Sequence, residues 1–190
     1  GLMTPRGGQV TFLGERIDGR PPHEIVGAGV AHVLERRRLF PFLTVRDNLL
    51  LGAHNRHARP HREESLARVE SLFPMLRDRR DQLAHTLSGG EQQMVAIARG
   101  LMARPRVLMI DEPFLGLAPR VVEQLSQVIT AINRDRGITV VFIEQNVELA
   151  LRLADRGYVL ESGRTILSGP SAELLQSPEV KRIFLGDAAL

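Results

Sequence analysis

An alternation of apolar strand-like runs and helical patterns in the second half of the chain limits its fold more than any other feature. The run VLMI (107–110) precedes a helical pattern over 120–134, and ITVVFIE (138–144) precedes another over 147–154. Strands that are apolar on both faces, each followed by a helix, are typical of parallel sheets covered by helices. The sequence therefore predicts an α/β fold built on a parallel sheet.

The rest of the chain adds short strands and a long helical region. By its periodicity the middle of the chain, about 44 to 104, is helical. The other expected elements are strands over 9–13 and 30–33, helices over 62–76 and from Ser88 to before Pro105, a hairpin turning at Ser162-Gly163, and a last helix from Ser171.

Composition narrows the class of protein. The 190 residues are 43% hydrophobic and 25% charged and contain no cysteine, and the longest unbroken apolar run is Met94–Ala98. A membrane span needs about 20 apolar residues, so none is predicted, and no signal peptide is visible. The net charge of +3 is modest and aromatic residues are few, which argues against nucleic acid as a partner. The run Arg36–Arg38 is interpreted as a solvated or partner-facing loop. We expect a cytoplasmic globular protein.

The segment HTLSGGEQQMVAIARG (85–100) starts a helix with an exposed serine and two glycines. Ser88 and Glu91 have the spacing of a capping box, in which each side chain binds the backbone N–H of the other residue. Gly89 and Gly90 add backbone that another group can approach closely, and free N–H groups at a helix N-terminus bind phosphate. From these residues alone two interpretations stay open, an ordinary helix cap or a phosphate-binding helix.

Two adjacent acids, Asp111 and Glu112, follow the VLMI run and precede Pro113. In open α/β sheets, ligands bind at the carboxyl ends of the strands. Adjacent carboxylates repel each other unless a cation shares the site, so Asp111 suits Mg²⁺ coordination and Glu112 suits orienting or deprotonating a water. The alternative is that Asp111 only caps the next turn, with Pro113 at its first position.

Together these motifs resemble the ATP-binding cassette of ABC transporters over almost the whole chain. LSGGEQQ (87–93) is similar to the family signature, VLMIDEP (107–113) to its Walker B strand and FLGLAP (114–119) to its D-loop. Glu35 and Gln145 stand where the family usually has its Q-loop glutamine and its switch histidine.

These two departures are usual in the ATPase subunits of branched-chain amino-acid importers, and the segment RRLFPFLTVRDNLLLGA (37–53) resembles the same branch. The resemblance implies a P-loop NTPase-like α/β core with an inserted helical subdomain. It divides the chain into part of the core over 1–34, the helical subdomain over 35–104, and the rest of the core over 105–190.

The resemblance also implies roles for single residues. Glu112 polarises the attacking water, and Gln145 orients this water or contacts the γ-phosphate. Asp111 and Glu35 help to hold Mg²⁺. The residues implied to contact ATP are Glu35, Leu87, Ser88, Gly89, Gly90, Glu91, Gln92 and Asp111.

A P-loop, Gly-x-x-x-x-Gly-Lys-Ser/Thr, does not occur in these 190 residues, whose only lysine is Lys181, preceded by valine. The segment GLMTPRGGQVTFLG (1–14) resembles the part of the family that follows the P-loop helix, which places that loop about ten residues before Gly1. We therefore expect an N-terminally truncated cassette that is inactive as an isolated chain.

Partners are also implied by the resemblance. We expect a head-to-tail pair with a second ATPase subunit, a paralogue, on two membrane permease subunits at the cytoplasmic face of the bacterial inner membrane. A periplasmic solute-binding protein would be an indirect partner. Phe40, Phe42 and Leu43 are too apolar for a free loop, so we predict that some are exposed and dock the permease. The alternative is that they fill the helical subdomain's own core.

The expected function is ATP hydrolysis coupled to import of branched-chain or related amino acids. Three alternatives stay open. One is an ABC ATPase for another solute, such as urea or exported lipopolysaccharide. The second is an ABC ATPase outside transport, a translation factor or a chromosome or repair ATPase, although neither a second cassette nor a long coiled coil occurs in this sequence. The third is a non-catalytic fragment that docks on a permease.

Overall fold

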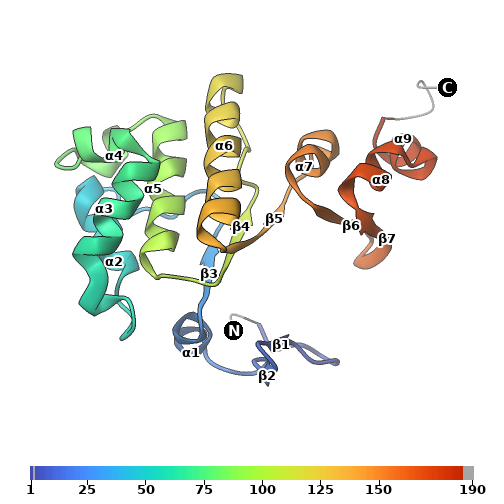
Figure 1. Cartoon of the computed structure of the whole chain (residues 1–190), viewed down its shortest axis with the longest axis horizontal. Coiled ribbons are helices and arrows are strands. Elements are labelled where there is room, and N and C mark those ends of the chain that lie inside the picture. The colour runs from blue at the N-terminus through green and yellow to red at the C-terminus, as the bar shows by residue number, and fades with distance from the viewer. Residues whose placement is uncertain (2, 186–190) are drawn as a thin grey trace. The chain divides into compact units, whose positions relative to one another are not determined.

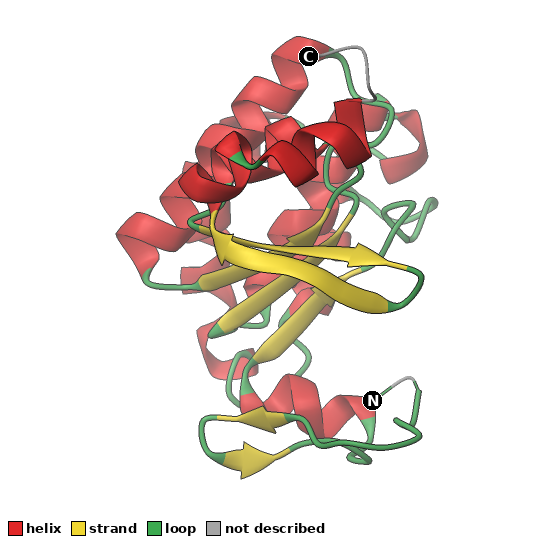
Figure 2. Cartoon of the chain, turned by 90° about the vertical axis from the view of Figure 1, so that its right-hand side faces the viewer, coloured by secondary structure: helices red, strands yellow, loops and turns green. Residues whose placement is uncertain are grey.

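A computed structural model describes residues 1 and 3–185 of the chain. The chain forms two compact units, residues 1–142 and 143–190. No helix in the described residues is long and apolar enough to cross a bilayer. The predicted α/β class is confirmed, because helices lie beside a sheet that contains parallel strands (Figures 1 and 2).

The first unit is built on a three-stranded sheet. Its strands are β3 (Val30–Val33), β4 (Val107–Asp111) and β5 (Thr139–Ile143), in that order, and Figure 2 shows them side by side. β3 and β4 are parallel, with Val33 opposite Ile110. Because parallel strands share their direction, the residues that follow β3 and β4 lie at the same edge of the sheet.

A group of helices lies beside this sheet (Figure 1): α2 (Val45–Gly52), α3 (Arg62–Leu72), α4 (Pro74–Asp78) and α5 (Gly89–Met102). Helix α5 is in contact with α2 and α3 and also with β3 and β4. Most of its apolar residues are accordingly buried, and Val95, Ile97 and Met102 are buried completely. Helix α5 is therefore the central element between the helical group and the sheet.

The predicted helix over 62–76 is wrong as one element, because the chain forms α3 and then the short α4. Phe73 separates them with φ −129° and ψ 78°, and Pro74 is the first residue of α4. The proline ring disfavours helical geometry in the residue before it, so the helix breaks at Phe73. Two short 3₁₀ helices, η1 (Arg59–His61) and η2 (Ala84–Thr86), complete this region.

The remaining elements of the first unit flank the sheet. The strand expected over 9–13 is instead half of a small hairpin, β1 (Thr11–Phe12) with β2 (Glu15–Arg16), and α1 (Pro22–Ala28) follows it. Helix α6 (Pro119–Arg136) begins after the DEP turn and ends at Gly137, whose φ of 65° suits a glycine cap.

The second unit contains α7 (Val147–Leu153), the antiparallel strands β6 (Arg156–Glu161) and β7 (Arg164–Pro170), α8 (Ser171–Gln176) and α9 (Pro178–Leu185). The predicted turn at Ser162-Gly163 is confirmed, with φ of 48° and 77°. The last helix is divided in two at Pro178. The apolar cluster of this unit is formed by Leu151, Val159, Leu174 and Val180.

Candidate functional site

The N-terminus of α5 carries the predicted capping box. Ser88 precedes the helix, its backbone N–H donates to Oε2 of Glu91 at 2.8 Å, and the N–H of Glu91 donates to Oγ of Ser88 at 3.4 Å. The two residues therefore satisfy two N–H groups that the start of a helix leaves without partners. The local geometry predicted for this segment is confirmed.

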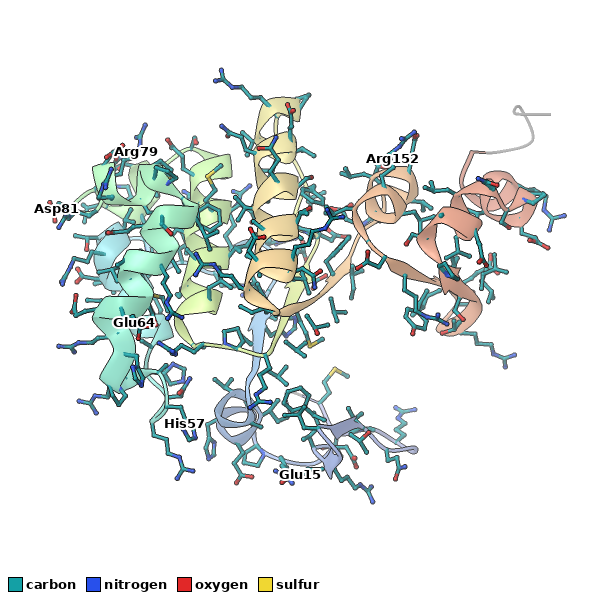
Figure 3. All side chains as sticks on the ribbon, viewed as in Figure 1. Glu15, His57, Glu64, Arg79, Asp81 and Arg152 are labelled. Carbon is teal, nitrogen blue, oxygen red and sulfur yellow. The ribbon has the colours of Figure 1, made fainter. Side chains whose placement is uncertain are left out.

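Glu91 also binds a residue that the sequence did not indicate. Its Oε1 lies 2.9 Å from Nη2 of Arg79, which follows α4 (Figure 3). Burial of Glu91 opposes ionisation, but the hydrogen bonds with Ser88 and the charge of Arg79 outweigh it and lower the pKa of this carboxyl. The negative charge of Glu91 is thus retained at the positive end of the helix dipole.

Side chains of the same unit lie against both glycines of the signature. A Cβ on Gly89 would stand 3.1 Å from Nη2 of Arg37, and a Cβ on Gly90 would stand 2.7 Å from Cγ1 of Val121 in α6. The close approach expected from two glycines therefore occurs within this unit. Gly90 lets α6 pack against the start of α5, and Gly89 accommodates a guanidinium.

The run Arg36–Arg38 adopts an unusual backbone conformation, with φ of 61°, 63° and 46° in succession. Such left-handed geometry costs about 1–2 kcal/mol for each residue that carries a Cβ. Arg99 of α5 holds this turn, because its Nη2 donates to the carbonyl oxygens of Arg37 at 3.2 Å and Arg38 at 2.8 Å. Burial lowers the pKa of the Arg99 guanidinium, which also lies 5.8 Å from the ring centre of Phe40.

Sequence reasoning missed the contributions of Arg37, Arg79, Arg99 and Val121 to this region. The basic run Arg36–Arg38 is the available signal in the sequence, but by itself such a run indicates only a solvated or partner-facing loop. Arg36 and Arg38 are exposed, as that interpretation expects, whereas Arg37 is half-buried against α5. The contacts of all four join segments far apart in sequence, which periodicity cannot reveal.

Two other signature residues have internal contacts. The Gln92 side chain donates to the carbonyl oxygens of Ala84 at 3.3 Å and Leu87 at 3.2 Å, and so fixes the turn before α5. The side chain of Leu87 is buried at 5% exposure. Any contact of Leu87 with a ligand would therefore come from its backbone.

The acids predicted for catalysis and for Mg²⁺ binding lie at the carboxyl edge of the sheet. Asp111 is the last residue of β4, and Glu35 lies two residues beyond the end of β3, which pairs with β4. Glu112 has φ of 46°, a left-handed conformation for which a side chain is strained. Strained backbone of this kind persists only where surrounding contacts impose it, so the turn at Glu112 is a fixed part of this edge.

The carboxylates of this edge can supply few ligands to a metal ion. In the described residues, no three His, Cys, Asp or Glu side chains are grouped to hold one. Glu35 is moreover paired with Arg36 at 3.3 Å. Mg²⁺ commonly takes one or two carboxylates and completes its shell with phosphate and water oxygens. Asp111 and Glu35 fit that limited role.

Gln145 lies in the second unit, in the turn between β5 and α7. Its backbone N–H and that of Asn146 donate to Oε2 of Glu144, at 3.1 and 3.3 Å. Asn146 then caps α7 by accepting from the N–H of Leu149 at 3.1 Å. These bonds fix the backbone of the turn that carries Gln145.

The apolar loop before α2 is exposed, as predicted. Phe40, Phe42 and Leu43 are 52%, 80% and 37% exposed, so they do not form the core of the helical group. Asn48 of α2 is fully buried and fixes this loop, because its side chain binds the N–H of Phe40 at 2.9 Å and the carbonyl oxygen of Phe40 at 3.0 Å. The loop therefore presents apolar side chains from a well-anchored backbone.

The sequence of this chain matches a known protein family. The family model described as ABC transporter matches residues 1–115, which include the segment 87–93 at the start of α5 and the acids Asp111 and Glu112 at the end of β4. The chain belongs to the ABC transporter family. The predicted identity as an ABC-type ATPase with the corresponding α/β fold is thus confirmed.

Individual relatives agree with this family. The high-affinity branched-chain amino acid transport ATP-binding protein BraG of Pseudomonas aeruginosa is 43% identical over 94% of this chain and 76% of its own length. The lipopolysaccharide export system ATP-binding protein LptB of Haemophilus influenzae is 32% identical over 98% of this chain and 78% of its own. A solved ATP-binding cassette of an ABC transporter, in its ADP conformation, is 25% identical, with a TM-score of 0.81 over 98% of this chain and 80% of its own.

Proposed function

We propose that this ABC cassette is the ATP-binding subunit of an importer for branched-chain or related amino acids. The observation that carries this proposal is the 43% identity to BraG over nearly the whole chain. The lower identity to LptB, 32%, makes lipopolysaccharide export the second candidate. Glu35 and Gln145, where many cassettes have glutamine and histidine, favour the first.

The chemistry is attack of a water molecule on the γ-phosphate of ATP. Glu112 orients and polarises this water from the carboxyl edge of the sheet, where it directly follows the last residue of β4. Asp111 and Glu35 would hold Mg²⁺, which supplies positive charge that offsets the negative charge of the phosphates. Gln145 orients the water or contacts the γ-phosphate. Because an amide does not take up a proton as imidazole does, its role is positioning only.

The start of α5 acts on ATP held by a second subunit. Ser88, Gly89 and Gly90 offer a hydroxyl, backbone N–H groups and the positive end of a helix dipole, all of which favour phosphate. Glu91 and Gln92 hold this start in place. We expect the second subunit to be a paralogue that carries histidine at this position, because imidazole can share a proton and the amide of Gln145 cannot.

The exposed loop of Phe40, Phe42 and Leu43 is the proposed docking surface for a permease subunit. Exposed apolar side chains on a fixed backbone are typical of interaction sites. With two permeases and, indirectly, a periplasmic binding protein, the subunit would work at the cytoplasmic face of the inner membrane.

The reaction is tested in the assembled transporter with Glu112→Gln. Loss of a water-positioning carboxylate should reduce turnover by about 10²–10⁴ while ATP binding is kept. Glu123→Gln on the exposed part of α6 is the matched control and should leave turnover unchanged. Equal turnover of the two variants would assign Glu112 to the turn alone.

The solute is tested by uptake of labelled leucine, isoleucine and valine into proteoliposomes that contain the transporter. ATP-dependent uptake that is lost in Glu112→Gln supports the proposal. ATP-dependent release of lipopolysaccharide, without amino-acid uptake, would establish the second candidate.

The 190-residue chain by itself should bind ATP poorly. It contains no P-loop sequence, and the backbone N–H groups and lysine of that loop normally supply most of the phosphate affinity. A helix N-terminus contributes only about 0.3–1 kcal/mol, whereas millimolar binding already needs about 4 kcal/mol. We expect MgATP binding no tighter than millimolar and no ATPase activity above background. A calorimetric titration with micromolar affinity would contradict this.

A further inference from the structure

Arg37 has a position that the roles proposed above do not explain. Its guanidinium rests on Gly89, the first residue of α5. Among the described residues its side chain makes one hydrogen bond, from Nη1 to Oε1 of Gln92 at 3.5 Å, the limit of such bonds, and it has no ion pair. A half-buried cation with so little compensation is a candidate for binding an anion.

The charge of Arg37 adds to that of the helix end. The N-terminus of a helix is positive, so a guanidinium there is unfavourable unless an anion joins it. The nearby acid cannot serve, because Glu91 is bound to the N–H of Ser88 and to Arg79. At the start of α5, Arg37 and the helix dipole therefore both favour an anion, while the carboxylate of Glu91 is bound to Ser88 and Arg79.

The position of Arg37 is fixed from α5 itself. Arg99 donates to the carbonyl oxygens of Arg37 and Arg38 and so holds three consecutive left-handed residues. Strained backbone persists only where surrounding contacts impose it, and here the contacts come from the same helix whose N-terminus the guanidinium covers. The turn thus directs Arg37 to the start of α5.

We propose that Arg37 binds a phosphate oxygen of the ATP molecule that a partner subunit presents to the start of α5. This rests on the proposed function, in which Ser88 and Gly89 meet that nucleotide. The guanidinium adds a full positive charge and charge-assisted hydrogen bonds to the hydroxyl and N–H groups already there. Arg37 is thus a binding residue contributed in trans, and Arg99 is its positioning residue.

The test is ATP-dependent closure of the assembled ATPase pair, measured by fluorescence transfer between labelled subunits in a Glu112→Gln background that prevents turnover. Arg37→Gln should raise the ATP concentration for half-maximal closure about tenfold, the effect expected for one charge-assisted contact. Arg38→Gln removes the same charge from the exposed neighbouring residue and should change the ATP concentration for half-maximal closure by less than twofold. Arg37→Lys should lie between them, because lysine keeps the charge but loses the planar fork.

Ser88→Ala in the same assay separates this inference from the proposed function. If Ser88→Ala weakens closure and Arg37→Gln behaves like Arg38→Gln, the role of Arg37 is overturned and the site at α5 stands. If neither Ser88→Ala nor Arg37→Gln has an effect, the site itself is wrong. If circular dichroism shows that Arg37→Gln does not fold, Arg37→Lys and Arg38→Lys are compared instead. A threefold higher ATP concentration for half-maximal closure in Arg37→Lys supports the role of Arg37, and equal concentrations overturn it.

Discussion

Helix α5 and strand β5 have similar apolar sequences, MVAIA and VVFI, but their side chains lie in different surroundings. In α5 the residues Val95 and Ile97 are completely buried. In β5, Val141 and Ile143 are 46% and 64% exposed. Apolar sequence alone therefore does not determine burial.

The difference follows from what packs on each element. Helix α5 packs against α2 and α3 and also against β3 and β4, so most of its apolar residues are covered by neighbouring elements. Strand β5 is the end strand of the described sheet, and alternate residues of it point to an uncovered face. Strands of parallel sheets normally bury both faces. In β5 one face keeps apolar side chains exposed, which another element could cover.

The largest predicted effect comes from Gly52→Ala, which breaks the close packing of α2 on α5. An added Cβ would stand 2.1 Å from the carbonyl oxygen of Arg99, a backbone atom that cannot move without shifting α5. We expect the free energy of unfolding to fall by about 3 kcal/mol or more, measured by urea denaturation.

Gly27→Ala in α1 is the matched control, because nothing lies within 4 Å of its added Cβ. Alanine is the better helix former, so this variant should be neutral or more stable by up to about 1 kcal/mol. Equal losses in the two variants would mean that α2 and α5 are not closely packed.

A smaller effect is expected for Asn48→Ala, next to α5 in the helical group. The side chain binds backbone groups of Phe40, Leu43 and Thr44 while fully buried. Loss of this amide leaves buried polar groups without partners, so we expect the free energy of unfolding to fall by about 2–3 kcal/mol. Asn133→Ala removes one exposed hydrogen bond, to the carbonyl of Ile138, and should lower the free energy of unfolding by less than about 1 kcal/mol; both variants are measured by urea denaturation. Equal costs would show that the apolar loop is not anchored by Asn48.

Local features of this fold could be predicted from the sequence. The capping box at Ser88 and Glu91, the strand before Asp111 and the turn at Ser162-Gly163 depend on residues within a few positions of each other, so their spacing is sufficient. The break at Phe73 is also local, because Pro74 causes it, but the apolar periodicity continues across it and favours a single helix.

The unpredicted features depend on contacts between distant segments. The guanidinium of Arg37 reaches α5 only because of three left-handed residues, and no propensity indicates such a turn at arginine. Val121 meets Gly90 through the packing of α6, and Arg99 holds a turn about sixty residues earlier. At the candidate site, the residue types and the family resemblance predict roles for the acids and the signature residues, whereas only the structure shows which residues lie next to them.

Glu91→Gln tests the charge at the start of α5. It should lower the free energy of unfolding by up to about 1 kcal/mol at pH 7. Glutamine keeps the capping hydrogen bond, so the loss is that of the charge facing Arg79 and the helix dipole. Because the folded pKa of Glu91 is lowered, its stabilisation is present above the ordinary pKa of glutamate and is lost as pH falls through the folded value. The difference between wild type and variant should therefore shrink below about pH 4. A difference that stays constant from pH 7 to pH 3 would exclude a charge effect.

The smallest effect is also the most direct test of the comparison, because the same chemical change can be made in α5 and in β5. Ile97→Val removes one methylene from a fully buried site and should cost about 1 kcal/mol. Ile143→Val removes it from a side chain that is 64% exposed and should change stability by less than about 0.5 kcal/mol. Valine suits a strand as well as isoleucine does, and the two differ little in a helix, so propensity does not mask the result. Both costs are measured by urea denaturation of the 190-residue chain. If Ile143→Val costs as much as Ile97→Val, the outer face of β5 is covered in solution, and the contrast between the two elements disappears.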